Sequence, residues 1–406
     1  MKKIICVLLA LLMLAPSHVT AFASETESTG TEETNETVTS EETTEAVETI
    51  ASEQTEAVTL QNYVEDVEIS SNSAVVYRVT GGKYYNEVGT GCAVFTFTGS
   101  NYRLLDDYVA VAYPYGNTLG LNYYIADANH IVFTTNTYNQ NVGSQVVAIR
   151  LVDVNGFYKD FSVSITAINL RQKTDDYVLL AKNKSEKLEL EYQTVTNGGW
   201  ITVPSHMVQY ASSDSAVAKV NAFGKVKAKS KAKTCYVTGT FATSTFYWAV
   251  NVTSKDKVKV IETAVDIYQT SKYSQPRRMQ NGYYDCSSLV WRAYKTVGVR
   301  FGVSSSYHYA PVAATEAKYL VSKGKQVKGG IKQNNTVKGK LVAGDLLFRG
   351  GHNNGRYRGV DHVEMFTGYS ISYIKSNGTP VYANNWASKP EGYYGYGSSG
   401  DFVCRP

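Results

Sequence analysis

The sequence predicts a multidomain protein in which two all-β sandwiches are followed by an α+β domain. The chain has 406 residues, enough for two or three domains. It contains 32 tyrosines and only 8 prolines, a composition that favours strands. Near Lys257 the spacing of apolar residues changes from alternating to helical. This composition excludes a collagen, a wholly disordered chain and a disulfide-dense miniprotein.

The N-terminus has the pattern of a secretory signal peptide. Lys2 and Lys3 precede an apolar run from Ile4 to Leu14, and the small residues Ala21 and Ala23 follow. A membrane anchor is the alternative, but this run is shorter than the roughly 20 apolar residues that span a bilayer. We therefore expect residues 1–23 to be removed and the protein to be secreted, without an integral membrane segment.

Residues 24–59 are predicted to form a disordered acidic stalk. The stretch 25–56 holds eleven glutamates and no lysine or arginine, and it has few large apolar residues with which to build a core. Without this stretch and the two signal lysines, 38 lysines and arginines face 25 aspartates and glutamates. This excess of positive charge in the folded part of the protein favours anionic partners, which outside a cell are wall polymers or a membrane surface. Nucleic acid is the weaker interpretation, because no nucleic-acid motif is present.

Residues 60–170 are predicted to form a β-sandwich, interpreted as immunoglobulin-like from the strand pattern alone. Short runs of β-type residues recur at nearly regular spacing, with Gly, Asn and Asp between them. The expected strands are Ala74–Val79, Ala93–Thr98, Tyr108–Tyr113, Gly120–Ile125, His130–Thr135, Gln145–Val154 and Phe161–Ile168.

Residues 171–254 resemble the bacterial group 2 immunoglobulin-like domain. The matching features are the turn Ser212–Asp214, the strand Ala216–Val220, the hairpin Gly224–Lys229 and the closing strand Phe246–Val252. Tyr210 stands where that family usually has tryptophan. Domains of this family act as spacers or adhesive modules. We assign no catalytic residue to either sandwich, and we expect the lone histidines of this region to lie on the surface or in ordinary packing.

Four cysteines remain after the signal peptide: Cys92, Cys235, Cys286 and Cys404. They could form two bridges in three alternative pairings, but so few cysteines do not make a disulfide framework. Cys92 and Cys235 lie in strand-like runs, where a cysteine is most often a small buried side chain.

Cys286 is the candidate nucleophile of the C-terminal third. Leu289, Val290 and Ala293 recur at helical spacing, and Asp285 just before them is a favourable N-cap. Cys286 is therefore expected in the first turn of a helix, where unpaired N–H groups and the helix dipole stabilise a thiolate. The alternatives are a buried structural cysteine and a bridge to Cys404.

A thiol nucleophile needs a base, and three histidines lie in this third of the chain. His362 opens an alternating, strand-like run, and Gly344–Phe348 is predicted to form a neighbouring strand. His308 and His352 lie in loops and are interpreted as surface or substrate-rim groups. A metal site is not expected, because no histidine pair has helical i, i+4 spacing and no CxxC motif occurs.

These residues resemble the NlpC-type cell-wall cysteine peptidases across residues 255–406. The resemblance rests on Asp285–Val290, Gly344–Leu346 and Asp361–Val363, together with the upstream Tyr273. It implies a papain-like α+β core and cleavage of peptidoglycan stem peptides between D-glutamate and a diamino acid, or at related D,L bonds. By position, Cys286 would be the nucleophile and His362 the general base, while Tyr273 would assist substrate or oxyanion binding. No cofactor is implied.

The third member of the catalytic group is expected on the strand after the histidine strand. Literal alignment places Tyr382 there, and Tyr382 and Asn384 share a strand face. We favour Asn384, because an amide oxygen can accept the imidazole N–H and fix its tautomer. Asn385 is a further candidate, and ordinary loop amides are the structural alternative.

Two functions from different classes follow. The first is a secreted, cell-wall-associated peptidoglycan hydrolase that acts through a Cys/His acyl-enzyme, with transfer of the acyl group to an amine as a variant. The second is a non-catalytic surface adhesin or wall-structural protein that carries a degenerate peptidase domain.

Overall fold

The computed structural model describes residues 64–80, 92–135, 139–242, 244–328, 341–387 and 400–406. The chain divides into the units Met1–Val58 and Thr59–Pro406, and all described residues belong to the second. The predicted signal peptide, residues 1–23, and the predicted stalk, residues 24–59, lie outside the described residues.

The first β-sandwich is built from two sheets that enclose an apolar core. One sheet has the strand order β1-β3-β6-β5, and in the other β8 pairs with β7 and β2 while β7 pairs with β4. The strands are β1 (Glu68–Ile69), β2 (Ser73–Val79), β3 (Cys92–Thr98), β4 (Val109–Ala112), β5 (Leu121–Asp127), β6 (His130–Thr135), β7 (Gly143–Val152) and β8 (Tyr158–Gln172), with a 3-10 turn at Asp106–Tyr108. Phe95, Phe133 and Ile165 are fully buried between the sheets. The strands expected from the sequence are confirmed.

The second sandwich pairs a four-stranded sheet, β13-β16-β17-β9, with a three-stranded sheet, β10-β15-β14. Its strands are β9 (Tyr177–Ala181), β10 (Ser185–Lys187), β13 (Gln209–Ser212), β14 (Ala218–Val220), β15 (Lys225–Ala228), β16 (Lys233–Phe241) and β17 (Ser244–Thr253), and η2 is Ser205–Met207. The predicted turn before β15 contains Gly224, with φ +75°. A Cβ there would meet Leu188 O at 2.6 Å, so only glycine fits this turn.

One long strand, β8, contributes to both sandwiches. Val163 and Ile165 pack into the core of the first sandwich, whereas Leu170, near the end of the same strand, packs into the core of the second. β11 (Leu190–Gln193) pairs with this end of β8 and also with β12 (Ile201–Thr202). The expected boundary between residues 170 and 171 therefore lies within a continuous strand.

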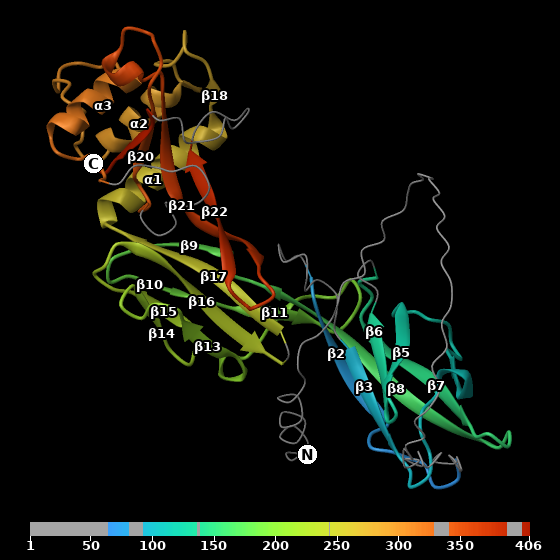
Figure 1. The fold of residues 1–406 in the computed structure, drawn as a ribbon. Coiled ribbons are helices and arrows are strands. Elements are labelled where there is room, and N and C mark those ends of the chain that lie inside the picture. The colour runs from blue at the N-terminus through green and yellow to red at the C-terminus, as the bar shows by residue number, and fades with distance from the viewer. Residues whose placement is uncertain (1–63, 81–91, 136–138, 243, 329–340, 388–399) are drawn as a thin grey trace, which may run out of the picture. The chain divides into compact units, whose positions relative to one another are not determined.

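The C-terminal part combines helices with an antiparallel sheet of order β22-β21-β20-β23 (Figure 1). The helices are α1 (Lys255–Thr270), α2 (Cys286–Lys295) and α3 (Ala313–Ser322). The strands are β18 (Lys272–Tyr273), β19 (Tyr283–Tyr284), β20 (Leu346–Arg349), β21 (His362–Ile374), β22 (Pro380–Ala387) and β23 (Phe402–Cys404), and η3 is Tyr357–Gly359. The expected α+β class is therefore present in this region.

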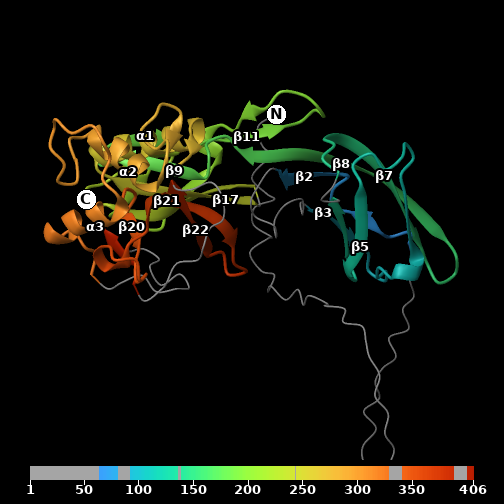
Figure 2. The ribbon, with the colours of Figure 1, turned by 90° about the horizontal axis from the view of Figure 1, so that it is seen from above.

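Alternation along the central strands gives this sheet two apolar faces. Val363 and Met365 of β21 pack in one cluster with Leu289 of α2 and Ala264 of α1, and Figure 2 shows both helices beside β21 and β20. Phe366, on the opposite face, packs in a separate cluster with Leu347 and Tyr369. The start of α2 is thus fixed against the strand that begins with His362.

Asn251 of β17 connects the second sandwich to β21. It is fully buried; its Oδ1 accepts the Tyr369 N–H at 2.8 Å, and its Nδ2 donates to Tyr369 O at 2.9 Å. The neighbouring Gly368 has φ +139°, and a Cβ there would lie 2.8 Å from the Asn251 side chain and 2.9 Å from the Tyr177 ring. Glycine at 368 therefore permits this contact.

The state of the four described cysteines tests the expectations made for them from the sequence. All four described cysteines are free, so the alternative of a bridge between Cys286 and Cys404 is wrong. Cys235 is buried, as expected, but Cys92 is exposed, which corrects the expectation made for it. Along β3 the buried side chains are Ala93, Phe95 and Phe97, so alternation turns Cys92 to the outer face.

Gly368→Ala should lower the free energy of unfolding by about 2–4 kcal/mol, because both the backbone conformation and the Asn251 contact must change. Gly378 is the matched control, since its φ is +74° but the nearest atom to an added Cβ is 3.7 Å away. Gly378→Ala should cost about 1 kcal/mol, the backbone contribution alone. Urea unfolding of both variants measures the difference, and equal losses would contradict the role given to Gly368.

Candidate active site

Cys286 is the first residue of α2 and is 5% exposed. The helix begins there because Asp285 caps it: its Oδ1 accepts the Ser288 N–H at 2.7 Å, and its own N–H donates to Ser288 Oγ at 2.8 Å. This capping box leaves the Cys286 sulfur at the positive end of the helix, where a thiolate is favoured. The sequence prediction of Asp285 as N-cap is confirmed.

Arg278 secures this helix start from the preceding loop. Its Nη1 lies 3.2 Å from Asp285 Oδ2, and its Nη2 donates to Ser287 Oγ at 3.1 Å and to Pro311 O at 2.8 Å. Arg278 and Asp285 are both buried, where a paired charge costs far less than an isolated one. One guanidinium thus ties α2 to the segment that leads into α3.

His362, the first residue of β21, forms a side-chain hydrogen bond with Cys286. Its Nε2 also lies 3.3 Å from Glu364 Oε1, and both side chains are largely buried, with 16% and 8% of their surfaces exposed. Residues i and i+2 of a strand share a face, so β21 itself supplies the carboxylate that orients the imidazole. His362 is thereby held between a sulfur and a carboxylate.

The surroundings of His362 favour its protonated form. Burial by itself would lower the pKa of the imidazole, but hydrogen bonds and charge interactions with Cys286 and Glu364 raise it to about 9. A histidine with this pKa is an imidazolium at neutral pH. The imidazolium is therefore the form of His362 that interacts with the Cys286 side chain at neutral pH.

Tyr273, at the end of β18, also interacts with Cys286. Its hydroxyl forms hydrogen bonds with the side chain and the backbone of Cys286. Burial above all, followed by the negative charge and hydrogen bond of Cys286, raises the pKa of Tyr273 well above 10, so its hydroxyl keeps its proton. The ring packs edge-on against Tyr284 with centroids 5.5 Å apart. The structure thus brings together Cys286, His362 and Tyr273.

Asn384 does not join this group, which corrects the sequence expectation. In the β21–β22 register Asn384 pairs with Tyr369, seven residues beyond His362, or about 20 Å along the strand. Tyr382 pairs with Ile371, still farther along, and Asn385 pairs with Gly368. Asn385 instead accepts a hydrogen bond from Ser370 Oγ at 3.3 Å. The carboxylate of Glu364 occupies the position expected for Asn384.

Glu316 is a buried acid near Cys286 that the sequence reasoning did not identify. It lies in the first turn of α3, is 0% exposed, and neither carboxyl oxygen has a hydrogen-bond partner among the described residues. Burial, followed by the charge of Cys286, raises its pKa well above the ordinary range. The surroundings of Glu316 therefore favour its neutral form.

The other two histidines of the C-terminal third lie on the surface. His308 is exposed, and His352 Nε2 lies 3.5 Å from Asp361 Oδ2 on the surface. In the described part of the chain, no cluster of His, Cys, Asp and Glu could hold a metal ion. Nor does any helix of the described residues have the length and apolar character of a membrane span.

Comparison with known proteins yields no family model and no curated protein that matches the chain. Solved structures that match include a 282-residue intimin fragment in complex with the translocated intimin receptor, at 14% identity and a TM-score of 0.27, covering 66% of this chain and 86% of that one. Drosophila N-cadherin EC1-4 matches at 11% identity and a TM-score of 0.19, covering 47% and 49%. Titin domains I67-I69 match at 10% identity and a TM-score of 0.22, covering 47% and 65%. TM-scores this low carry no argument about function.

Glu364→Gln should lower the pKa of His362 from about 9 toward the ordinary value of about 6.5, because the amide no longer stabilises the imidazolium by charge. NMR titration of the imidazole measures this shift. Asp361→Asn is the matched control, since it removes a neighbouring carboxylate that faces His352 instead. A pKa for His362 unchanged by Glu364→Gln would show that Glu364 does not orient this histidine.

Proposed function

We propose that residues 255–406 are an NlpC-type, papain-like cysteine endopeptidase that hydrolyses amide bonds in the stem peptides of peptidoglycan. The observation that carries this proposal is the hydrogen-bonded pair of Cys286, at a helix N-terminus, and His362, at a strand start. Tyr273 beside the same sulfur adds a hydrogen-bond donor. Nucleophile, base and donor are the parts that acyl transfer through a thiol requires.

In the first step the Cys286 thiolate attacks the carbonyl carbon, and the C=O electron pair moves to oxygen. In this proposal the backbone N–H of Cys286 and the protonated Tyr273 hydroxyl, which lie together at the sulfur, stabilise that oxyanion. The C–N bond then breaks as the His362 imidazolium donates its proton to the leaving amine. This leaves a thioester on Cys286 and a neutral imidazole.

In the second step water attacks the thioester while His362 accepts its proton. The C–S bond breaks, the carboxylic acid leaves, and the thiolate–imidazolium pair is restored. Glu364 is a positioning residue throughout, because it holds Nε2 of His362 and stabilises the imidazolium. If an amine replaces water in this step, the same residues catalyse acyl transfer, and only the products differ.

The substrate class rests on the resemblance of the motifs around Cys286, His362 and Tyr273, which implies cleavage between D-glutamate and a diamino acid or at a related D,L bond. Export rests on the signal-like residues 1–23, and retention at the wall on the basic body. In this proposal the two sandwiches act as spacer or binding modules that keep the peptidase at the cell wall.

The second candidate is a surface adhesin or wall-structural protein whose peptidase domain is inactive. The solved structures named above fit this alternative better than the first, because they are adhesion-type and immunoglobulin-like proteins, although their TM-scores give the fit no weight. The alternative predicts an unreactive Cys286 and no digestion of peptidoglycan.

Wild-type protein should release fragments from purified peptidoglycan, and Cys286→Ala should reduce release by at least about a thousandfold, because the nucleophile is lost. Mass spectrometry of the fragments identifies the bond cut and separates hydrolysis from acyl transfer. Cys92→Ala is the matched control, since it removes an exposed free thiol from the first sandwich and should leave release unchanged. Identical fragments from the wild type and Cys286→Ala, or none from either, would favour the adhesin.

The rate of peptide cleavage should be retained through neutral pH and fall as the pH rises through about 9. The sign follows from His362: its pKa is raised to about 9, so the proton needed by the leaving amine is present below that value and lost above it. A profile of kcat/KM against pH measures this limb, and in Glu364→Gln it should move to lower pH. A wild-type limb near pH 6.5 would contradict the assignment of His362 as general acid.

A further inference from the structure

A cavity of about 470 Å³ lies apart from Cys286 and is lined by cations. Among the described residues, the charged side chains that line it are those of Lys182, Lys257, Lys325 and Arg405, with no acidic side chain beside them. Lys182 follows β9 of the second sandwich, Lys257 belongs to α1, and Arg405 follows β23. Like charges gathered around one hollow repel each other, so the cavity is suited to an anion.

The carboxylate of Asp345, next to the cavity residue Arg405, is engaged by that cation. Asp345 is fully buried; its Oδ1 accepts from Arg405 Nε at 2.8 Å, and its Oδ2 accepts from Arg405 Nη2 at 2.7 Å. Its Oδ2 also accepts the Val342 N–H at 2.9 Å. The single negative charge of Asp345 is thus shared between Arg405 and Lys257, which carry two positive charges, and among the described residues it forms no ion pair with Lys182 or Lys325.

The ammonium group of Lys257 has no hydrogen-bond acceptor among the described residues. Its Nζ is buried and lies 3.7 Å from Asp345 Oδ1, beyond hydrogen-bonding distance, and it has no hydrogen-bond partner among the described residues. Burial lowers the pKa of Lys257 to about 8; Asp345 offsets part of this effect, and the charges of Arg405 and Lys325 add to it. An anion in the cavity would provide the missing acceptor and reduce the repulsion.

The start of α1 adds to the same field. Its N-cap, Ser254, lines the cavity, and its Oγ accepts the Lys257 N–H at 3.2 Å. The helix is 16 residues long, and its positive end favours a bound anion. The helix end and the buried ammonium of Lys257 are independent features that favour the same kind of ligand.

We propose that this cavity binds a phosphoryl group through Lys182, Lys257 and Lys325. A phosphoryl group offers several acceptor oxygens and carries one negative charge as a diester or up to two as the free ion, which suits the excess of positive charge around the cavity. The group is either free inorganic phosphate or a phosphodiester of an anionic wall polymer. The site is separate from the proposed peptidase centre, because neither Cys286 nor His362 lines the cavity.

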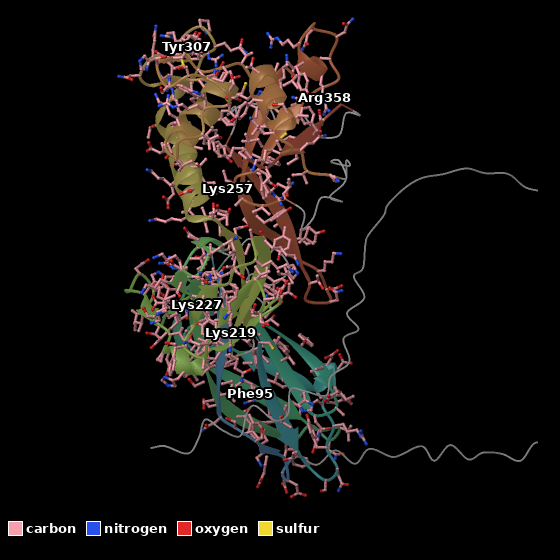
Figure 3. The ribbon with its side chains drawn as sticks, turned by 90° about the vertical axis from the view of Figure 1, so that its left-hand side faces the viewer. Phe95, Lys219, Lys227, Lys257, Tyr307 and Arg358 are labelled. Atoms are coloured by element: carbon pink, nitrogen blue, oxygen red, sulfur yellow. The ribbon has the colours of Figure 1, made fainter. Side chains whose placement is uncertain are left out.

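The test compares two double variants of the full chain that each remove two positive charges. Lys182→Gln with Lys325→Gln changes two exposed lysines of the cavity. Lys219→Gln with Lys227→Gln is the control; these exposed lysines pair across β14 and β15 and do not line the cavity, and Figure 3 labels both, together with Lys257. Isothermal titration at constant ionic strength uses inorganic phosphate in one arm and glycerophosphoglycerol, a phosphodiester, in the other.

The cavity variant should bind roughly tenfold more weakly than the wild type, and the control should stay within about twofold. Binding of both probes, with this loss, assigns the site to phosphodiesters as well as to free phosphate. Binding of inorganic phosphate alone assigns it to the free ion, and binding of the diester alone assigns it to the polymer. If neither probe binds, the proposal is overturned, and the positive charge of the cavity is neutralised by other groups of the same chain. An equal loss in both variants would also overturn it, because it would reflect net charge alone.

Discussion

The geometry around Cys286 depends on the interactions that the carboxylate of Asp285 makes. It closes the capping box of α2 with Ser288 and pairs with the buried guanidinium of Arg278. Arg278 in turn holds the carbonyl groups of Ala310 and Pro311, just before α3. The loop before α2, the start of α2 and the segment before α3 therefore meet around the residue that precedes Cys286. The thiol is placed by a network of buried charges as much as by apolar packing.

Where local chemistry determines the structure, the sequence was sufficient to predict it. Asp285 predicts the start of α2 because a carboxylate satisfies N–H groups that a helix end leaves unpaired. Alternation predicts a strand that opens with His362, and the motif resemblance brings in Tyr273. Each of these predictions needs only a few consecutive residues, and the structure then brings His362 and Tyr273 into contact with Cys286.

The partner of His362 could not be predicted in the same way, because strand pairing is a long-range property. Met365 already pairs with Ala387, so Asn384 falls far from the histidine, and the register shift between Phe366 and Gly368 moves it only one residue farther, opposite Tyr369. A usable signal was nonetheless present, since Glu364 is two residues from His362 and must share its face. The sequence also gave no indication that β8 serves two cores, or that Asn251 would contact the backbone of β21.

The unbridged state of Cys286 has a consequence for chemical durability. In its thiolate form a cysteine reacts readily with peroxide. The first product is a sulfenic acid, which a second thiol can capture as a disulfide. The described cysteines are all free, and where none of them reaches the Cys286 sulfur, continued exposure carries it on to sulfinic acid, which ordinary reductants do not reverse. The working lifetime of such a centre outside a reducing compartment is thus set by oxidant as well as by folding stability.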